Sequence, residues 1–583
     1  MRGKRTRVNN GNEQEALISP LQMVLRNFLG DKVALTGVIL VGFVFLCCLI
    51  LPIFFPIDSY YQDVTQANVA PGFGMLKAPA GLHGNAADLA VGSTFSIGVD
   101  QEGNVYEWGT FPTEKLKKLP ADLGKVVKVS AGLDHVLALN EEGVLFTWGN
   151  DRMGLGAIPL ELRSGEQIRQ IYAGYQVSFA LTEEGRLYNW GNSYLIEPKY
   201  PQGIQGEIEK FAVNTNLAMV LTKAGEIVPL TQKASAFTKI PEEIQGQEID
   251  IALSDESMAA VLADGSVSVW GSNVKGTLDT PEFEKTAVRV EGGRYHFTVL
   301  FEDGTVRTWG DNTFGQEKEP KISERIGQIS AGYYGTYAIG ENGEVYGWGL
   351  KGYLMGTDAF GRDVFRRLLE GGRMSMTVGA IAVIISTIIG VLIGGISGYK
   401  GGKTDNLLMR FTEIVSAIPF LPFAIILSAV LGNTISETQR ILLIMMILGL
   451  LSWPGIARLV RGSVLAEREQ EFVTAAKALG VKEAGIIFRH ILPNIITVII
   501  VNATLKFATC MLTESSLSFI GFGVQEPNAT WGNMLTGAQN SQVIQEYWWR
   551  WVFPSLALGI CTISINCVGD GLRDAIDPKS NER

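Results

Sequence analysis

Few residues in this sequence have the types and the spacing that chemistry requires. The segment SGYKGGKT at 397–404 nearly matches a phosphate-binding loop, but Ser397 stands where the first glycine of such a loop belongs. The segment also lies in a short turn between two apolar runs, without the preceding strand that a nucleotide site of this kind needs. We therefore interpret it as a turn, and any ATPase that works with this chain must be a separate protein.

Histidine and cysteine provide no better candidates. His135 and His296 occupy the same position of an internal repeat, and we assign Phe179 to that position in another copy, which favours a structural role over a metal site. All cysteines lie in apolar runs, which excludes a disulfide framework in the polar part of the chain. The cysteines are Cys47, Cys48, Cys510, Cys561 and Cys567. We find no nucleophile–base pair, carboxylate pair or metal-ligand cluster, so we predict no catalytic residue, no metal, no cofactor and no enzyme activity.

The composition indicates a membrane protein that carries a soluble domain. The chain has 583 residues, 46% of them hydrophobic, and a formal net charge of −10. This length is enough for two or more domains. The apolar residues gather near the N-terminus and in the C-terminal part, whereas the acidic excess lies in the polar middle. No basic stripe with interleaved aromatic residues is present, which argues against a nucleic-acid partner.

Six apolar runs are long enough to cross a membrane. Each provides about 20 residues, the length that spans roughly 30 Å of hydrocarbon as a helix. Backbone groups in lipid must bond within their own segment, so we expect helices. The alternative for the first run is a cleaved signal peptide, but this run is longer than a typical signal core and no small-x-small site follows it. The runs are 33–55, 376–398, 407–432, 440–460, 492–512 and 551–569.

Charge next to the runs predicts their orientation. Basic residues precede the first run, whereas Asp58 and Asp63 follow it, so the positive-inside rule places the N-terminus in the cytoplasm. Six crossings return the C-terminus to the same side and leave the long polar insert outside. The basic residues are Arg2, Lys4, Arg5, Arg7, Arg26 and Lys32 at the start of the chain, and Arg573, Lys579 and Arg583 at its end.

A repeat of about 40 residues fills the polar middle of the chain. One phrase, an acidic-Gly turn followed by an alternating strand that ends in Trp-Gly, recurs with this period, which is the range of propeller blades. The Gly supplies the positive φ of a tight hairpin turn. Seven copies predict a seven-bladed β-propeller. The copies are QEGNVYEWG (101–109), EEGVLFTWG (141–149), EEGRLYNWG (183–191), a decayed KAGEIVPL (223–230), ADGSVSVWG (263–271), EDGTVRTWG (302–310) and ENGEVYGWG (341–349).

This pattern resembles the regulator-of-chromosome-condensation repeat over roughly 85–350. The resemblance implies a fold and leaves the function open, because such propellers serve many partners. Six loop residues follow the AG-type turns and could line one face, since Tyr and Arg are favoured at binding surfaces. Ordinary exposed loop residues are the alternative. The six are Asp134, Tyr175, Arg294, Tyr295, Tyr333 and Tyr334.

Short phrases around the insert resemble the permease subunits of the dipeptide, oligopeptide and nickel family of ATP-binding-cassette importers. They include GTDAFGRDVFR (356–366), EFVTAAKALG (471–480), ESSLSFIGFGVQEP (514–527) and GDGLRDAIDP (569–578). The resemblance covers about 20–83 and 353–583. LKAPAGLH at 76–83 and YLMGTD at 353–358 look like the two halves of one family loop. The propeller is therefore predicted to be an insertion into the first extracytoplasmic loop, where additions are tolerated.

The resemblance implies a polytopic α-helical membrane protein of six transmembrane helices with an inserted all-β propeller. It implies a homologous permease subunit, two ATP-binding-cassette ATPases and an extracytoplasmic solute-binding protein as partners. Peptide is the family's default cargo, and nickel or another small solute stays possible. The predicted parts are the cytoplasmic N-terminus (1–32), the first helix (33–55), a linker (56–83), the extracytoplasmic propeller (84–352) and the permease domain (353–583).

The resemblance also assigns the coupling of transport to ATP hydrolysis to the cytoplasmic loop 464–490. In the family a short helix with small residues docks into the ATPase. Thr474 replaces the acidic residue that is common at the start of this motif, which leaves the choice of partner open. The residues that match the motif here are Glu471, Ala475, Ala476, Gly480 and Pro493.

Two further expectations concern the membrane part. Gly390, Gly394 and Gly398 recur at every fourth residue, which predicts close helix packing. Arg410 with Glu413, and Pro419 with Pro422, mark a polar and irregular stretch of the third span, which is either a polar pathway or an interfacial helix end.

A different class of function also fits part of the sequence. The chain could be a surface receptor or adhesion protein in which the permease part is only an anchor, although an anchor would not need a coupling motif. The propeller could capture cargo, dock the binding protein, shield the entrance or bind cell-wall material.

Overall fold

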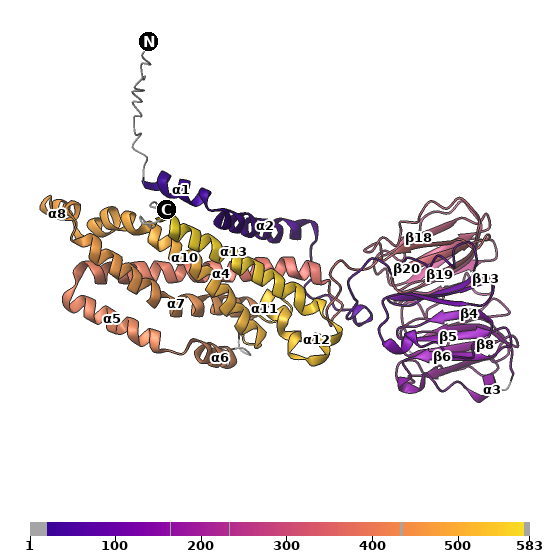
Figure 1. Cartoon of the computed structure of the whole chain (residues 1–583). Helices are drawn as coiled ribbons and strands as arrows, with labels where there is room; N and C mark the ends of the chain where they lie inside the picture. Colours follow the sequence, from indigo (N-terminus) through magenta and orange to yellow (C-terminus); the bar gives the residue numbers. More distant parts are fainter. Residues whose placement is uncertain (1–19, 164, 232–233, 432–434, 577–583) are drawn as a thin grey trace, which may run out of the picture. The chain divides into compact units, whose positions relative to one another are not determined.

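The computed structural model describes residues 20–163, 165–231, 234–431 and 435–576 (Figure 1). The chain forms two compact units, one of Met1–Tyr60 with Val364–Arg583 and the other of Tyr61–Asp363. The second unit contains the residues predicted to form the propeller together with the segments that flank them. The terminal basic residues that orient the chain lie outside the described residues, namely Arg2, Lys4, Arg5, Arg7, Lys579 and Arg583.

The first unit is helical. Among the described residues, five helical segments are long and apolar enough to cross a membrane, and a bent pair of helices brings the number to six if the pair counts as one span. The long helices are α2 (Lys32–Phe54), α4 (Val364–Lys400), α7 (Glu437–Arg468), α10 (Leu492–Phe519) and α13 (Trp549–Ile576). The shorter elements are α1 (Pro20–Gly30), α5 (Gly402–Ala417), α6 (Phe420–Leu431), α8 (Glu471–Ala478), α9 (Glu483–Gly485), the π-helical turn η4 (Ile486–Ile491), α11 (Trp531–Met534), η5 (Leu535–Gln539) and α12 (Ser541–Glu546).

The third span differs from its prediction as one helix over 407–432. The structure has α5 and α6, which meet at an angle of 69°. Pro419 lies at the break and disfavours a helical conformation of the residue before it. Ile418 accordingly has an extended backbone, with φ −69° and ψ 117°. The prolines thus break this span rather than bend it slightly.

Close packing of α4 against α7 confirms the prediction from the glycine spacing. A Cβ atom on Gly390 would lie 2.7 Å from Ile456 Cβ, and one on Gly398 would lie 2.8 Å from the Arg461 carbonyl oxygen. Neither position has room for a side chain. The two helices can therefore approach to backbone contact, as small residues allow in membrane helices.

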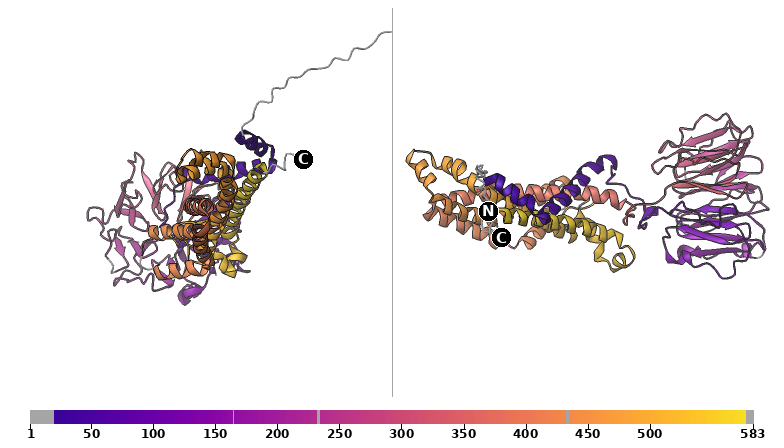
Figure 2. Two further views of the ribbon diagram at one scale, coloured as in Figure 1. Left: turned by 90° about the vertical axis from the view of Figure 1, so that its left-hand side faces the viewer. Right: turned by 45° about the horizontal axis from the view of Figure 1, so that its top comes forward.

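The second unit contains, within its described residues, seven three-stranded antiparallel sheets that follow one another along the chain (Figures 1 and 2). This confirms the seven predicted blades. Their strands are β1 (Ala86–Val91), β2 (Phe95–Asp100) and β3 (Val105–Gly109); β4 (Val126–Ala131), β5 (His135–Asn140) and β6 (Leu145–Gly149); β7 (Ile168–Ala173), β8 (Val177–Thr182) and β9 (Leu187–Gly191); β10 (Ile208–Val213), β11 (Ala218–Thr222) and β12 (Ile227–Pro229); β13 (Glu248–Leu253), β14 (Ser257–Leu262) and β15 (Val267–Gly271); β16 (Ala287–Gly292), β17 (His296–Phe301) and β18 (Val306–Gly310); β19 (Ile326–Ala331), β20 (Gly335–Gly340) and β21 (Val345–Gly349). Short helices η1 (Val64–Gln66), η2 (Glu114–Lys117), η3 (Arg152–Gly154) and α3 (Leu160–Arg163) lie in the connecting segments.

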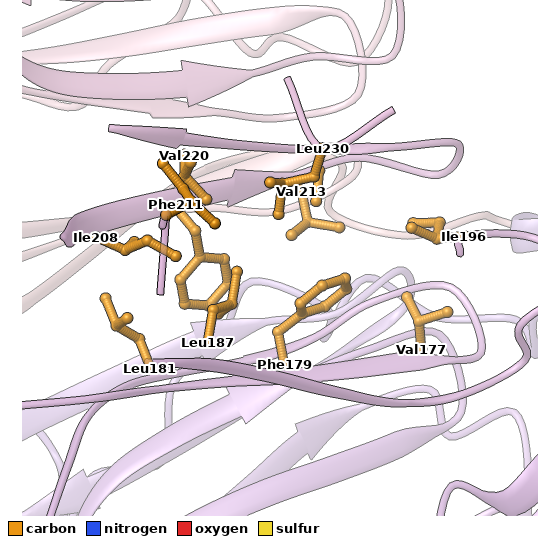
Figure 3. Close-up of a cluster of buried hydrophobic side chains, with 12 residues drawn as sticks. Val177, Phe179, Leu181, Leu187, Ile196, Ile208, Phe211, Val213, Val220 and Leu230 are labelled. Atoms are coloured by element: carbon orange, nitrogen blue, oxygen red, sulfur yellow. The ribbon is translucent and has the colours of Figure 1, made fainter. Parts of the chain in front are cut away.

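Apolar side chains fill the space between neighbouring blades. Figure 3 shows Phe179 of the third blade facing Phe211 of the fourth, and their ring centroids are 5.8 Å apart. The strand pairing corrects the repeat position given to Phe179. Phe179 pairs with Asn189, whereas His135 pairs with Gly149, so the residue equivalent to His135 in this blade is Val177, which pairs with Gly191.

Side chains on the inner strands connect successive blades around a central tunnel. Asp250 accepts from the Val290 N–H at 2.8 Å, and Lys210 Nζ donates to Asp250 at 2.5 Å. The first and last blades share no strand, so side chains close the ring. Gln328 Nε2 donates to Asp88 at 2.5 Å, and Trp108 Nε1 donates to the Tyr337 hydroxyl at 2.7 Å.

Candidate functional site

The predicted coupling segment forms a short helix, α8, between two long ones. Glu471 and Ala475 are exposed on it, whereas Ala476 is buried together with Val473. The buried pair packs in a cluster with Val464 of α7 and residues of η4 and α10. The two alanines of the motif therefore have different roles. The small side chain of Ala476 lets α8 pack closely against the rest of this chain, whereas the small side chain of Ala475 leaves space on the exposed surface of α8.

Gly480 and Pro493 define the ends of elements in this segment. Gly480 has φ +75°, its N–H donates to the Lys477 carbonyl at 3.0 Å, and the Val481 N–H donates to the Ala476 carbonyl at 3.1 Å. This is the glycine C-cap that ends α8. Pro493 lies in the first turn of α10, directly after the π-helical turn η4, and has no N–H to donate to a carbonyl of that turn. The motif thus provides one helix end and one helix start.

Apolar residues next to Ala475 extend the exposed surface of this segment. Leu479 is 84% exposed and Phe472 is 37% exposed. Large apolar side chains exposed together are typical of interaction sites. Sequence reasoning did not select these two residues, because a helical pattern alone does not show which apolar positions face the protein.

An ion pair connects α5 with α7. Arg461 donates to both carboxylate oxygens of Asp405, Nε at 2.5 Å and the other guanidinium nitrogen at 2.6 Å. Ser397, at the end of α4, donates to the same carboxylate. The segment 397–404 thus ends one helix and begins the next, as its interpretation as a turn predicted. No sequence pattern indicated the pairing, because Asp405 and Arg461 lie far apart in the chain.

Arg410 and Glu413 form a surface pair on α5. Arg410 donates to Glu413 at 3.0 Å, and both side chains are largely exposed. The role of this pair at a polar pathway or at an interfacial helix end stays a prediction.

In the second unit, Arg294 and Tyr334 bind a residue of the linker. Arg294 and the Tyr334 hydroxyl both donate to the Asp63 carboxylate. Asp63 also accepts from the Thr65 hydroxyl at 2.7 Å. Tyr334 is only 5% exposed, so this residue does not line an open face. We name the group of Asp63, Thr65, Arg294 and Tyr334 the clamp.

The electrostatics of the clamp favour the charged pair. Burial by itself would raise the pKa of Asp63, but hydrogen bonds and charge from Arg294 and hydrogen bonds from Tyr334 and Thr65 lower it overall. Burial opposes the charge of Arg294, yet its bonds with Asp63 keep the pKa of the guanidinium above its usual range. Burial and the nearby Asp63 carboxylate raise the pKa of Tyr334, so its hydroxyl stays a donor.

The linker segments on the two sides of the propeller bind each other. The Tyr353 hydroxyl donates to Gln66 Oε1 at 2.5 Å, and the Thr357 hydroxyl donates to the Gln66 carbonyl at 2.5 Å. The Val69 N–H donates to the Thr357 hydroxyl at 2.8 Å. We name segments 61–75 and 351–363 the stalk. Sequence reasoning treated Asp63 only as a charge that orients the first span, and no local pattern marked the stalk.

The other four loop candidates of the propeller have different surroundings. Asp134 accepts from Asn150 Nδ2 at 2.5 Å, which holds its own loop. Tyr175, Tyr295 and Tyr333 are half-buried. The Arg294 guanidinium lies 5.4 Å from the Tyr295 ring centroid, in cation–π range. Arg294 also lies 5.9 Å from the Tyr334 ring centroid, and the Tyr333 and Tyr334 rings are 6.2 Å apart, so these four candidates lie together. Their role as a binding surface stays a prediction.

His135 and His296 are buried between blades. His135 Nε2 lies 2.9 Å from the Ser178 hydroxyl, and His296 Nε2 lies 3.1 Å from the Thr336 hydroxyl. Burial lowers the pKa of each imidazole to about 4. Within the described ranges, no group of three or more His, Cys, Asp or Glu side chains is arranged to hold a metal ion.

Comparison with known proteins gives separate matches for the membrane part and for the blades. Residues 390–582 match the family described as the binding-protein-dependent transport system inner membrane component, and residues 19–71 match the N-terminal TM domain of oligopeptide transport permease C. Residues 126–154 and 287–316 match the regulator of chromosome condensation (RCC1) repeat.

Relatives of the helical unit are peptide permeases. The oligopeptide transport system permease protein OppC of Haemophilus influenzae is 45% identical over 232 residues, which are 40% of this chain and 72% of that protein. The dipeptide transport system permease protein DppC of Bacillus subtilis is 40% identical over 224 residues, 38% of this chain and 68% of that protein.

Among solved structures, the crystal structure of human WBSCR16 aligns with 48% of this chain and 98% of its own, with 16% identity and a TM-score of 0.37.

Proposed function

We infer the function from the premise that the chain belongs to the family of permease proteins of binding-protein-dependent peptide transport systems. The chain is accordingly a multi-pass membrane protein and a transporter component. We propose that it forms a translocation pathway together with a homologous permease. Two separate ATPases would drive the transport, and an extracytoplasmic binding protein would deliver the cargo, for which we propose peptides.

The observation that carries this proposal is the exposed surface of α8. Val473 and Ala476 fix the helix to the membrane unit, while Ala475 and Leu479 stay exposed. A helix that is fixed on one side and exposes small and apolar residues on the other suits a groove on a partner protein. We propose that the ATPase provides this groove. A movement of the ATPase would be transmitted to α7 through the cluster around Val464, and from α7 to α5 through the Arg461–Asp405 pair.

The test replaces the exposed alanine. Ala475→Trp fills the proposed contact surface without entering the core, so we expect the complex to lose peptide-stimulated ATP hydrolysis and uptake of labelled oligopeptides. Ala224→Trp, the same change on an exposed hairpin of the propeller, is the matched control and should keep both activities. If Ala475→Trp leaves stimulated hydrolysis and uptake unchanged, α8 does not couple the two proteins.

We also propose the orientation in which both termini are cytoplasmic and the propeller is extracytoplasmic. Arg26 and Lys32 before the first span support it. The experiment introduces a cysteine at Ala224 of the propeller or at Ala484 of α9, both exposed. A membrane-impermeant maleimide should label Ala224→Cys in intact cells and Ala484→Cys only after permeabilisation. The opposite labelling pattern would reverse the orientation.

The propeller is proposed to bind an extracytoplasmic partner or the cargo. The clamp supports this role, because Arg294 and Tyr334 bind the linker residue Asp63 and so connect the blade loops to the segment that leads to the first span. Excision of 84–352 joins the two halves of the linker and tests the role through peptide uptake. Loss of uptake with intact assembly would support participation in delivery. Unchanged uptake would favour the alternative of an independent surface receptor or adhesion module.

A further inference from the structure

The central tunnel of the propeller contains a chamber with unusual side chains. The tunnel encloses a cavity of about 670 Å³, lined by the inner strands of the blades. This volume lies within the range of small-ligand sites, roughly 300–1,000 Å³. Three of the third residues on the inner strands, Asp88, Lys210 and Asp250, connect neighbouring blades, so these three polar groups serve the ring itself.

The fifth residues of the same strands form a different ring. Five of them are small, namely Ala90, Ser130, Ala212, Ala252 and Ser330, and they leave the space that the cavity occupies. The other two are Tyr172 and Glu291, which belong to the third and sixth blades and line the cavity from separate parts of the ring. Tyr333 follows two residues after the end of the last inner strand and also lines the cavity. We name this part of the tunnel the chamber.

Glu291 is an acidic group of the chamber that makes two long ion pairs. Arg289 Nε lies 3.7 Å from Glu291 Oε1 and Lys210 Nζ lies 3.9 Å from it, both beyond hydrogen-bonding distance. Lys210 is instead bound to Asp250 at 2.5 Å. Burial raises the pKa of Glu291, although the two cations partly offset this effect. The carboxylate would therefore gain from a cation that reaches hydrogen-bonding distance.

Tyr172 lies within electrostatic range of Asp255 and Glu291, whereas Tyr333 lies within range of Asp255 and of Tyr172. Burial raises the pKa of Tyr172, and the charges of Asp255 and Glu291 raise it further. Burial also raises the pKa of Tyr333, with Tyr172 and Asp255 among its neighbours. Both phenols therefore stay protonated, and their oxygens can accept hydrogen bonds. Asp255 is already bound to Arg294 at 3.1 Å, so Glu291 is the carboxylate that a ligand would meet.

We propose that the chamber binds the free N-terminal ammonium group of a short peptide. An ammonium group has three N–H donors and no acceptor. Glu291 and the hydroxyls of Tyr172 and Tyr333 provide acceptors, and the tyrosine rings add cation–π attraction. Arg289, which is half-exposed in the tunnel wall, provides a cation for the carbonyl or carboxylate end of the peptide. The tunnel mouth is accessible at the start of the inner strands, where Ile249 is exposed.

This inference rests on the proposed peptide cargo, and its test distinguishes a failure of the chamber proposal from a failure of the cargo proposal. The full chain in lipid nanodiscs is titrated calorimetrically with trialanine, N-acetyl-trialanine and trialanine amide. We expect trialanine and its amide to bind and the acetylated peptide to bind at least about tenfold more weakly. Glu291→Gln and Tyr172→Phe should weaken the binding of trialanine by about tenfold or more. Glu209→Gln, the same change elsewhere in the tunnel wall, is the matched control and should bind like the wild type.

A second variant fills the chamber without changing its charge. Ser330→Phe should abolish the binding of trialanine while the thermal unfolding of the propeller stays cooperative. The inference is overturned if the wild type does not bind trialanine, if the acetylated peptide binds equally, or if Glu291→Gln binds like Glu209→Gln. Peptide uptake is measured on the same variants. Uptake without chamber binding would overturn the chamber alone, whereas chamber binding without uptake of any peptide would overturn the proposed transport cargo.

Discussion

Acidification acts on two groups in the core of the propeller. His135 and His296 are buried between blades, and burial lowers the pKa of each to about 4. An imidazole in an unfolded chain has a pKa of about 6.5. Between these values the unfolded chain binds more protons than the folded chain, so the free energy of unfolding decreases as the pH falls through 6.5 towards 4.

The size of the effect follows from the two pKa values. At pH 5, each histidine lowers the free energy of unfolding by about 2 kcal/mol relative to pH 8. The two together give about 4 kcal/mol, a large fraction of the 5–15 kcal/mol that stabilises a typical domain. We therefore expect the propeller, and not the helical unit, to unfold first on acidification.

Hydrogen–deuterium exchange of the full chain, read by mass spectrometry, measures the two units separately. Exchange of strands β5 and β17 should rise steeply between pH 7 and pH 5 after correction for the intrinsic rate. His135→Gln with His296→Gln removes the titration and should flatten this dependence by about 4 kcal/mol. His490→Gln, outside the propeller, is the control. If the double variant keeps the pH dependence of the wild type, the burial of these histidines does not control the stability of the propeller.

Three further changes test other parts of the structure. Arg294→Ala leaves the buried Asp63 carboxylate without its cation and should lower the free energy of unfolding of the second unit by about 3 kcal/mol in urea titrations; Arg307→Ala, an exposed control, should change it by less than about 0.5 kcal/mol. Gly480→Ala places a side chain at φ +75° and should weaken coupling to the ATPase, measured as peptide-stimulated ATP hydrolysis, by a factor equivalent to about 1 kcal/mol. Gly480→Asn should have an intermediate effect, and equal stimulated hydrolysis in the wild type and both variants would show that the cap is unimportant. Arg461→Ala removes both bonds to Asp405 and should lower the midpoint of thermal unfolding of the helical unit, which an unchanged midpoint would contradict.

Local patterns predicted most of the fold. The acidic-Gly and Trp-Gly phrases repeat with the period of one blade, so the number of blades followed from counting them. The glycine spacing from Gly390 to Gly398 likewise predicted a close helix contact, because a missing side chain has a direct steric consequence. The third span was predicted less well. Hydropathy averages over a window and does not show that Pro419 breaks the segment into α5 and α6.

The contacts between distant segments could not be predicted from the sequence. Arg294 and Tyr334 have the residue types of a binding surface, and they do bind, but their partner is Asp63 of the same chain. More than 200 residues separate these partners, and no local pattern indicates that the linker folds back onto the blade loops. The chamber was missed for a similar reason, since Tyr172 and Glu291 come to line one cavity only when the ring of blades closes.

The difference between Ala475 and Ala476 also needed the structure. The motif contains both alanines and does not distinguish them, yet Ala475 is exposed and Ala476 is packed in the cluster with Val473 and Val464. A helix of two turns without a strong apolar pattern does not define its buried side. The structure thus distinguishes Ala476, which packs within the chain, from Ala475, which is the proposed contact residue.

The most direct test of the central claim uses this difference. The chain is co-expressed with the second permease and the ATPases of its own cell, purified as a complex and reconstituted in liposomes with its binding protein. ATP hydrolysis and the uptake of a labelled oligopeptide are then measured for the wild type and for Ala475→Trp. Our account predicts that Ala475→Trp still inserts and folds but loses stimulated hydrolysis and uptake together. Wild-type levels of both activities in Ala475→Trp would contradict a permease that is coupled to its ATPases through α8.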